Sequence, residues 1–126
     1  PFNPPGMVLP ASRYSQGVEV GPDARWLHVS GQIGVAADGT VAKGLAVQFK
    51  QAFENIGTVL AAAGMAKTDI VKVMVFVTVP GPETVGIYRK ARDQWMDGHA
   101  PAATYLVVAG LAHADYLVEI EAVAAG

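Results

Sequence analysis

The fold is decided by residues 45–79, in which the stretch LAVQFKQAFENIGTVLAAAG (Leu45–Gly64) is soon followed by VKVMVFVTV (Val71–Val79). In the first stretch, apolar residues recur every three or four positions, which is the period of one face of an α-helix. These residues are Leu45, Phe49, Ala52, Phe53, Ile56, Val59, Leu60 and Ala63. Gly64 follows at the position where helices favour a left-handed cap. The pattern predicts a helix from Leu45 to about Ala63.

The second stretch predicts a strand that is covered on both faces. Valine occupies alternate positions from Val71 to Val79, and the positions between them are still half apolar. A strand with one face in water would instead alternate apolar with polar residues. Pro80-Gly81-Pro82 ends the strand, because proline lacks the N–H that a sheet ladder needs.

The rest of the chain predicts a second helix and four further strands. Helical spacing runs from Val85 to about Met96, with the aliphatic stem of Arg92 lying along the apolar stripe. The predicted strands are Tyr14–Val20, Trp26–Gly31, Thr104–Val108 and Tyr116–Ala124, and the first two are expected to form a hairpin. Residues 1–13, which are rich in proline, are expected to form an irregular arm.

These elements predict an α+β two-layer sandwich in the order β-β-α-β-α-β-β. Both helices would lie on one face of a mixed sheet, and the other face would be left open. Self-association is the expected cover for that open face. A chain of 126 residues is expected to form a single domain, residues 1–126.

Composition excludes several classes of function. The net charge is −2 and no run of Lys or Arg is present, so nucleic acid is not an expected partner. The chain has no cysteine, which excludes disulfides, thiolate catalysis and cysteine-bound metals. His28, His99 and His113 are not at ligand spacing, so no metal site is predicted. No apolar leader or membrane span is recognisable, and a cytoplasmic, non-membrane protein is expected.

Four segments together resemble the RidA family, also called the YjgF or L-PSP family. They are Tyr14-Ser15-Gln16-Gly17-Val18, Val29-Ser30-Gly31-Gln32-Ile33-Gly34, Ala61-Ala62-Ala63-Gly64 with Val71-Lys72-Val73, and Val118-Glu119-Ile120-Glu121-Ala122-Val123. The resemblance implies a chorismate-mutase-like fold and a homotrimer with small-molecule clefts between neighbouring subunits. It also implies the hydrolysis of reactive enamines and imines to 2-oxo acids and ammonia, with no metal or organic cofactor.

The resemblance places the family's site on Tyr14, Ser30, Gly31 and Glu119. Glu119 would carry the proton, while Tyr14 and Ser30 would orient water or polarise a carbonyl group. Without the resemblance, Glu119 would more simply be part of a solvated or interface-paired face, which it shares with Glu121 at strand spacing.

The substrate-binding segment departs from the family at one position. The family clamps the substrate carboxylate with an arginine in a Pro-Ala-Arg-Ser motif, whereas this chain has Pro101-Ala102-Ala103-Thr104. Ala103 therefore stands where the clamp is expected, followed by Thr104 and by Tyr105, which still offers a backbone N–H. The asparagine of deaminating members is also absent, since it aligns near Val85 or Gly86.

The missing arginine sets an expectation for activity. Arginine holds a carboxylate through two parallel hydrogen bonds, and each bond to a charged group contributes about 1.5–3 kcal/mol. Efficient deamination of general 2-imino acids is therefore not expected. His113 or Arg13 could supply the missing positive charge.

The resulting prediction is a RidA-like hydrolase with enamine/imine deaminase-type chemistry. One alternative is a non-catalytic trimer that binds a metabolite or acts as a chaperone-like surface. A second alternative is an endoribonuclease, against which the mild acidity and the lack of a basic track argue.

Overall fold

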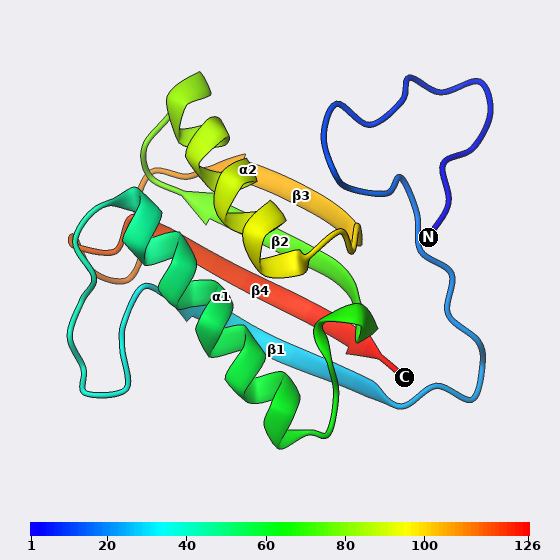
Figure 1. The fold of residues 1–126 in the computed structure, drawn as a ribbon. Helices are drawn as coiled ribbons and strands as arrows, with labels where there is room; N and C mark the ends of the chain where they lie inside the picture. Colours follow the sequence, from blue (N-terminus) through cyan, green and yellow to red (C-terminus); the bar gives the residue numbers. More distant parts are fainter.

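The computed structural model describes residues 1–126 and has two layers, a four-stranded sheet and a pair of helices on one of its faces (Figure 1). Its elements are β1 (Trp26–Ile33), α1 (Leu45–Ala62), a short 3₁₀ turn (Lys67–Asp69), β2 (Ile70–Val77), α2 (Pro82–Met96), β3 (Ala102–Val107) and β4 (Val118–Ala125). The layers confirm the predicted α+β sandwich. No helix combines the length and the apolar character that crossing a membrane requires.

The sheet has the strand order β1-β4-β2-β3 and mixed pairing. Strand β4 pairs antiparallel with β1 and with β2, while β2 and β3 are parallel. A parallel pair needs a crossover between its strands, and α2 provides it. Strands β1 and β3 are consequently the two edges of the sheet.

The core lies between the sheet and α1. Residues at helical spacing on α1 are almost fully buried, and so is every second residue of β2 and β4. The largest apolar side chains among them are Phe49, Phe53, Ile56, Leu60, Ile70, Val73, Val75, Val77, Val118 and Ile120. Each such side chain contributes about 1.5–3 kcal/mol when it is removed from water. The alternate residues of β2 and β4 point to the face that no helix covers, so this open face is available for a site or a partner.

The end of α1 follows the predicted cap. Gly64 has φ +70°, its N–H donates to Ala61 O over 3.0 Å, and the N–H of Met65 donates to Leu60 O over 2.9 Å. These are the paired hydrogen bonds of a Schellman motif, which satisfy carbonyl groups that the helix leaves free.

The predicted strand Tyr14–Val20, and with it the hairpin to β1, is not formed. The segment makes only isolated bridges, from Ser15 to Ala102 and from Gly17 to Phe2. The Ser15 N–H donates to Pro101 O over 3.1 Å, so the segment lies along β3. Because β3 and β1 are opposite edges of the sheet, a segment anchored at one cannot pair with the other. The observed order is therefore β-α-β-α-β-β.

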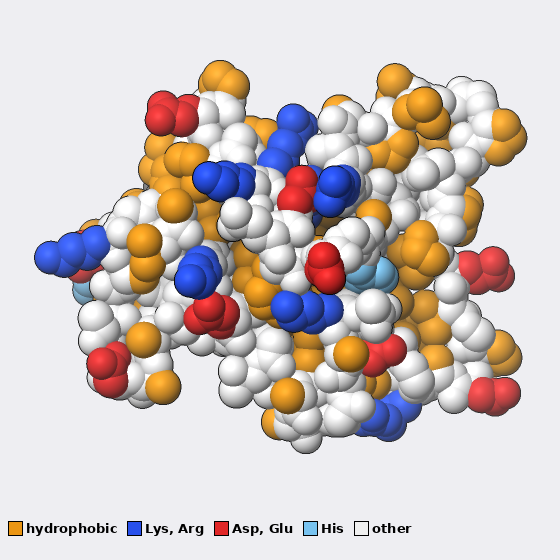
Figure 2. All heavy atoms as spheres, viewed as in Figure 1, with side chains coloured by type: hydrophobic (Ala, Val, Ile, Leu, Met, Phe, Trp, Pro, Cys, Tyr) orange, Lys and Arg blue, Asp and Glu red, His pale blue; other side chains and the backbone are white.

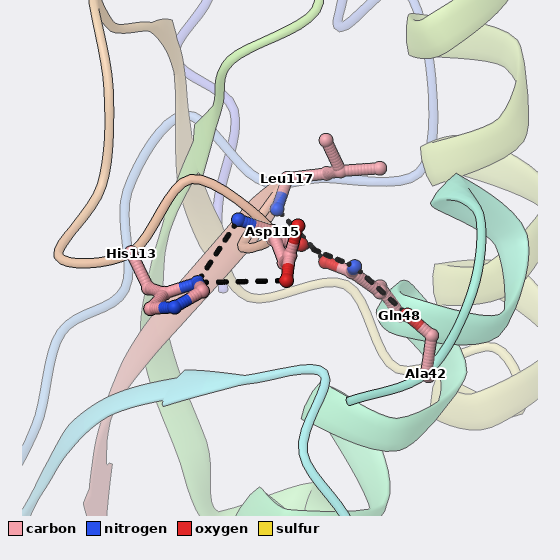
Figure 3. Close-up of polar contacts among 5 residues, drawn as sticks. All are labelled: Ala42, Gln48, His113, Asp115 and Leu117. Carbon is pink, nitrogen blue, oxygen red and sulfur yellow. Dashed lines mark hydrogen bonds and ion pairs between the residues drawn. The ribbon is translucent and has the colours of Figure 1, made fainter. Parts of the chain in front are cut away.

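One buried polar residue fixes the loops at an end of the sheet (Figure 3). Gln48 is 2% exposed, and its Nε2 donates to Ala42 O and to Asp115 O, each over 2.9 Å. Its Oε1 accepts the N–H of Leu117 over 2.9 Å. A side chain of α1 thus holds the chain just before β4 and sets where that strand begins.

Candidate functional site

A cavity of about 410 Å³ lies where the N-terminal arm, α2 and β3 meet. Its lining includes three of the predicted site residues, Tyr14, Ala103 and Tyr105. The other lining residues are Ser12, Gln16, Val85, Tyr88, Arg89 and Arg92.

Each wall of the cavity follows from local structure. On α2, Val85, Tyr88 and Arg92 are three and four positions apart, so they lie on one helix face. On β3, the alternation of a strand turns Ala103 and Tyr105 toward the helix layer. The arm is held beside β3 at the residue after Tyr14, where Ser15 Oγ donates to Ala100 O over 2.5 Å.

The cations of this cavity come from α2. Ala103 brings no charge to its wall, whereas Arg89 and Arg92 both line the cavity. The stem of Arg92 was predicted to lie along the apolar stripe, but a role for its guanidinium group was not predicted. The spacing of Tyr88 and Arg92, four residues apart on the apolar face, was the signal that could have indicated it.

The guanidinium group of Arg92 is buried and incompletely paired. Arg92 is 3% exposed, and its Nε donates to Asp93 Oδ1 over 2.9 Å. Its Nη1 donates to Ser12 Oγ over 3.3 Å. Nη2 lies 2.9 Å from the same oxygen of Asp93, but outside hydrogen-bond geometry, so Nη2 has no hydrogen-bond partner.

Two tyrosine hydroxyl groups in the cavity wall also lack partners. The hydroxyls of Tyr88 and Tyr105 are buried and make no hydrogen bond of good geometry, although the Arg92 guanidinium is near enough to the Tyr88 hydroxyl to act as a weak donor. The two rings lie 5.4 Å apart between centroids. Burial raises the pKa of both phenols, and for Tyr88 the positive charge of Arg92 opposes part of this rise. Both hydroxyls therefore remain protonated donors near neutral pH.

Glu119 lies against Gly31 rather than in this cavity. A Cβ atom on Gly31 would overlap Glu119 Oε1 and lie 2.7 Å from Cδ and 2.9 Å from Cγ. Pairing of β1 with β4 shifts register between Val29 and Gln32, which marks a β-bulge around Ser30 and Gly31. Bulges commonly occur next to functional sites, because they re-aim side chains. Here the bulge and the missing side chain give the carboxylate its place.

Thr104 and Lys72 lie on the same open face as Glu119. The Lys72 Nζ donates to Thr104 Oγ1 over 2.7 Å, between neighbouring strands. Directly across from Glu119 on β2 is Phe76. The open face therefore offers an acid, a cation and an aromatic side chain within one sheet.

The structure thus divides the predicted site into two groups. Tyr14, Ala103 and Tyr105 are together in the cavity on the helix side of β3. Ser30, Gly31, Thr104 and Glu119 line no part of that cavity, and Glu119 and Thr104 point to the opposite face of the sheet. Within one chain the two groups do not face each other.

Neither of the two alternative cations lines the cavity. His113 is exposed in the loop between β3 and β4, where its Nδ1 accepts the N–H of Asp115 over 3.1 Å (Figure 3). Arg13 is exposed on the arm. His99 has a structural contact, with Nε2 2.7 Å from Ile70 O. No three His, Asp or Glu side chains gather as metal ligands.

This arrangement defines an α+β protein with a cavity at one edge of its sheet and an acidic group on the open face. A family model described as Endoribonuclease L-PSP matches residues 7–126. The 2-iminobutanoate/2-iminopropanoate deaminase of Homo sapiens is 37% identical over 124 residues, which are 95% of this chain and 82% of that protein. The chain therefore belongs to the L-PSP family, which is also the RidA or Rid family, and the recognition made from its sequence is confirmed.

Solved structures support the same assignment. A Rid-family protein of unknown function from Yersinia pestis superposes with a TM-score of 0.89 at 30% identity, covering 98% of this chain and 95% of that one. The TdcF protein of E. coli, solved with bound serine, has a TM-score of 0.72 at 32% identity, covering 95% of this chain and 91% of that one.

Proposed function

We propose that the protein hydrolyses a small imine or enamine in a cleft that two copies of the chain complete. The observation that carries this proposal is the placement of Glu119, which lies over a glycine on an uncovered face of the sheet. Relatives that carry the name deaminase, at about 35% identity, support the reaction class.

In the proposed reaction, the carboxylate of Glu119 accepts a proton from a water molecule as its oxygen attacks the C=N carbon. The C–O bond forms while the electron pair of the C=N double bond moves to nitrogen. Glu119 then returns the proton to that nitrogen, which gives a carbinolamine. The carboxylate next takes the proton of the carbinolamine hydroxyl as the C=O bond forms, and passes it to the nitrogen as the C–N bond breaks. The products are a carbonyl compound and ammonia. Ser30, which is exposed and precedes Gly31 in the bulge, would hold the water.

The proposal requires a second copy because the cavity and Glu119 belong to opposite faces of one sheet. The open face also carries Met74, Phe76 and Leu106, apolar side chains that favour burial. A trimer that packs these faces together, as the resemblance implies, could bring Glu119 of one copy to the cavity of the next. Sedimentation measurements at micromolar concentration test this requirement, and a monomer under assay conditions would contradict it.

Turnover tests the role of Glu119 directly. The assay follows ammonia or 2-oxo acid released from freshly generated imines, with Glu119→Gln as the variant and Glu121→Gln as the control. Glu121 lies two residues away on the same face of the strand. Glu121→Gln therefore removes the same negative charge from the same region, but it leaves the proposed proton carrier, Glu119, intact. Glu119→Gln is expected to lose about 10²- to 10⁴-fold in kcat, the usual contribution of general acid–base catalysis. Equal effects of the two changes would contradict the proposal.

The same panel separates the other candidate functions. A rise in Tm with a metabolite and no turnover would favour a binding protein. For RNA, the charge pattern is unfavourable, because Lys and Arg side chains on the helix-bearing face are interspersed with acidic ones (Figure 2). A protein that follows a phosphate backbone needs a continuous basic track.

A further inference from the structure

We propose that Arg92, together with Tyr88 and Tyr105, forms a carboxylate-binding subsite in the cavity, in place of a cation at position 103. The subsite would accept an anion carried on an apolar body larger than that of a simple 2-imino acid. As a statement about substrate, this inference rests on the proposed function; as a statement about binding, it can be tested without turnover.

The unpaired polar atoms carry the argument. Three buried side-chain polar atoms of the chain lack a hydrogen-bond partner, namely Tyr88 Oη, Arg92 Nη2 and Tyr105 Oη. All three belong to residues that line the same cavity. Buried polar groups are almost always paired, because leaving one unpaired destabilises the fold. Three unpaired donors around one cavity therefore indicate that a ligand with acceptor oxygens belongs there.

The free part of the guanidinium group matches a carboxylate. Asp93 contributes one oxygen, which binds Nε and lies beside Nη2, and Ser12 accepts only one bond from Nη1. The remaining N–H bonds of Nη1 and Nη2 form the end of the arginine fork. Two parallel hydrogen bonds from this fork fit the two oxygens of a carboxylate. The bond from Nη1 to Ser12 is long, at 3.3 Å, so a carboxylate can replace the serine hydroxyl as acceptor.

The charges favour a ligand with one negative charge. Asp93 balances Arg92, which leaves Arg89, exposed at the same cavity, as the uncompensated cation. The phenols of Tyr88 and Tyr105 add donors but no charge. A monocarboxylate would therefore leave the subsite close to neutral.

The position of Arg92 sets the size of the ligand. An arginine at position 103 would reach into the cavity from β3, whereas Arg92 enters it from α2, with its guanidinium carbon 5.4 Å from the centroid of the Tyr88 ring. The same cavity is also lined by the aromatic side chains of Tyr14 and Tyr105, and Ala103 leaves free the space that an arginine would fill. A ligand that reaches Arg92 needs an apolar or aromatic body to fill this space. The substrate class is therefore an imine or enamine that bears both a carboxylate and such a body.

Three stable probes separate charge from shape. Phenylacetate carries the body and the carboxylate, phenylacetamide carries the body with a neutral amide, and acetate carries the carboxylate alone. Isothermal titration is expected to show phenylacetate binding at least about tenfold more tightly than either of the others. Equal affinity for phenylacetate and phenylacetamide would overturn the inference.

Variants then assign the effect to residues. Arg92→Lys keeps the charge but removes the fork, and is expected to weaken phenylacetate binding by about 10- to 100-fold. Lys90→Gln is the matched control, since Lys90 is exposed on the same helix and does not line the cavity. Unchanged phenylacetate affinity in Arg92→Lys would overturn the inference.

Tyr88→Phe tests the subsite in a protein whose Arg92 is unchanged. Removal of an unpaired buried hydroxyl is expected to leave Tm unchanged or to raise it, while phenylacetate binding weakens. A fall in Tm with unchanged binding would show instead that the hydroxyl is structural. Glu119→Gln separates this inference from the proposed function, because it should lower kcat by about 10²- to 10⁴-fold and leave phenylacetate binding intact. If the protein hydrolyses imines, and Arg92→Lys changes neither that turnover nor phenylacetate binding, the proposed subsite is refuted while the proposed function stands.

Discussion

Replacing Gly31 by alanine is expected to impair activity while leaving the fold intact. The new Cβ would occupy the space of the Glu119 carboxylate, with Cδ only 2.7 Å away. Gly31 does not need a positive φ, so alanine fits its backbone conformation. The group it displaces is the end of a flexible side chain, which can rotate away. The carboxylate would then leave its place on the open face.

The expected magnitudes differ for stability and for activity. Alanine reduces the freedom of the unfolded chain, which stabilises the protein by about 0.4–1 kcal/mol. A strained rotamer of Glu119 costs about 0.5–1.5 kcal/mol, so the free energy of unfolding should change by less than about 1 kcal/mol. A misplacement of about 1 Å in a catalytic group lowers the rate about 100-fold, which corresponds to about 2.7 kcal/mol of transition-state stabilisation.

Urea denaturation and imine turnover measure the two effects side by side. Gly34→Ala is the comparison, because its Cβ would lie 2.7 Å from the backbone Cα of Gln48 and 2.5 Å from its Cγ. Helix α1 would have to shift, so this variant is expected to lose about 1–3 kcal/mol of stability. The reasoning would be refuted by a Gly31→Ala protein that keeps full activity, or by one that is destabilised as much as Gly34→Ala.

Three further predictions concern stability. Gln48→Ala leaves the carbonyls of Ala42 and Asp115 and the N–H of Leu117 without their partner, so urea denaturation should show a loss of about 2–4 kcal/mol; a loss under 1 kcal/mol, the lower bound for one such group, would contradict this role. The raised pKa of Tyr88 disfavours its phenolate in the folded chain, so the free energy of unfolding should fall as the pH rises above 10. Tyr88→Phe should lessen that fall, and an identical pH profile would argue against it. Gly64→Ala forces a side chain into φ +70° and should lower stability by about 1 kcal/mol, whereas an unchanged Tm would argue against strain at this cap.

The sequence predicted the elements whose signal is a period. Helix α1 and strand β2 were predicted within two residues at each end, because burial of one face leaves a regular apolar pattern. The segment Tyr14–Val20 has similar alternation but forms no strand. Alternation indicates that a segment can pair as a strand. Whether a free sheet edge lies beside that segment depends on the order of the strands, which a local sequence pattern does not contain.

The candidate site was predicted in part for a similar reason. The motifs identified Gly31 and Glu119, and the structure places them in contact. Their separation from Tyr14 and Ala103 follows from the two faces of the sheet. The role inferred for Arg92 depends on which of its donors are left unpaired, and this is a property of the folded geometry that residue spacing cannot reveal.

The strand order also has a consequence for biosynthesis. Strand β4 is the last element along the chain, yet it lies between β1 and β2 and joins them. While a ribosome is still producing residues 118–125, β1 has no neighbour to pair with, and one of the two edges of β2 is left without its hydrogen-bonded partner. Nascent chains arrested before this strand emerges from the exit tunnel should therefore remain open to proteases and chaperones, and protection should arrive in one step when β4 is released.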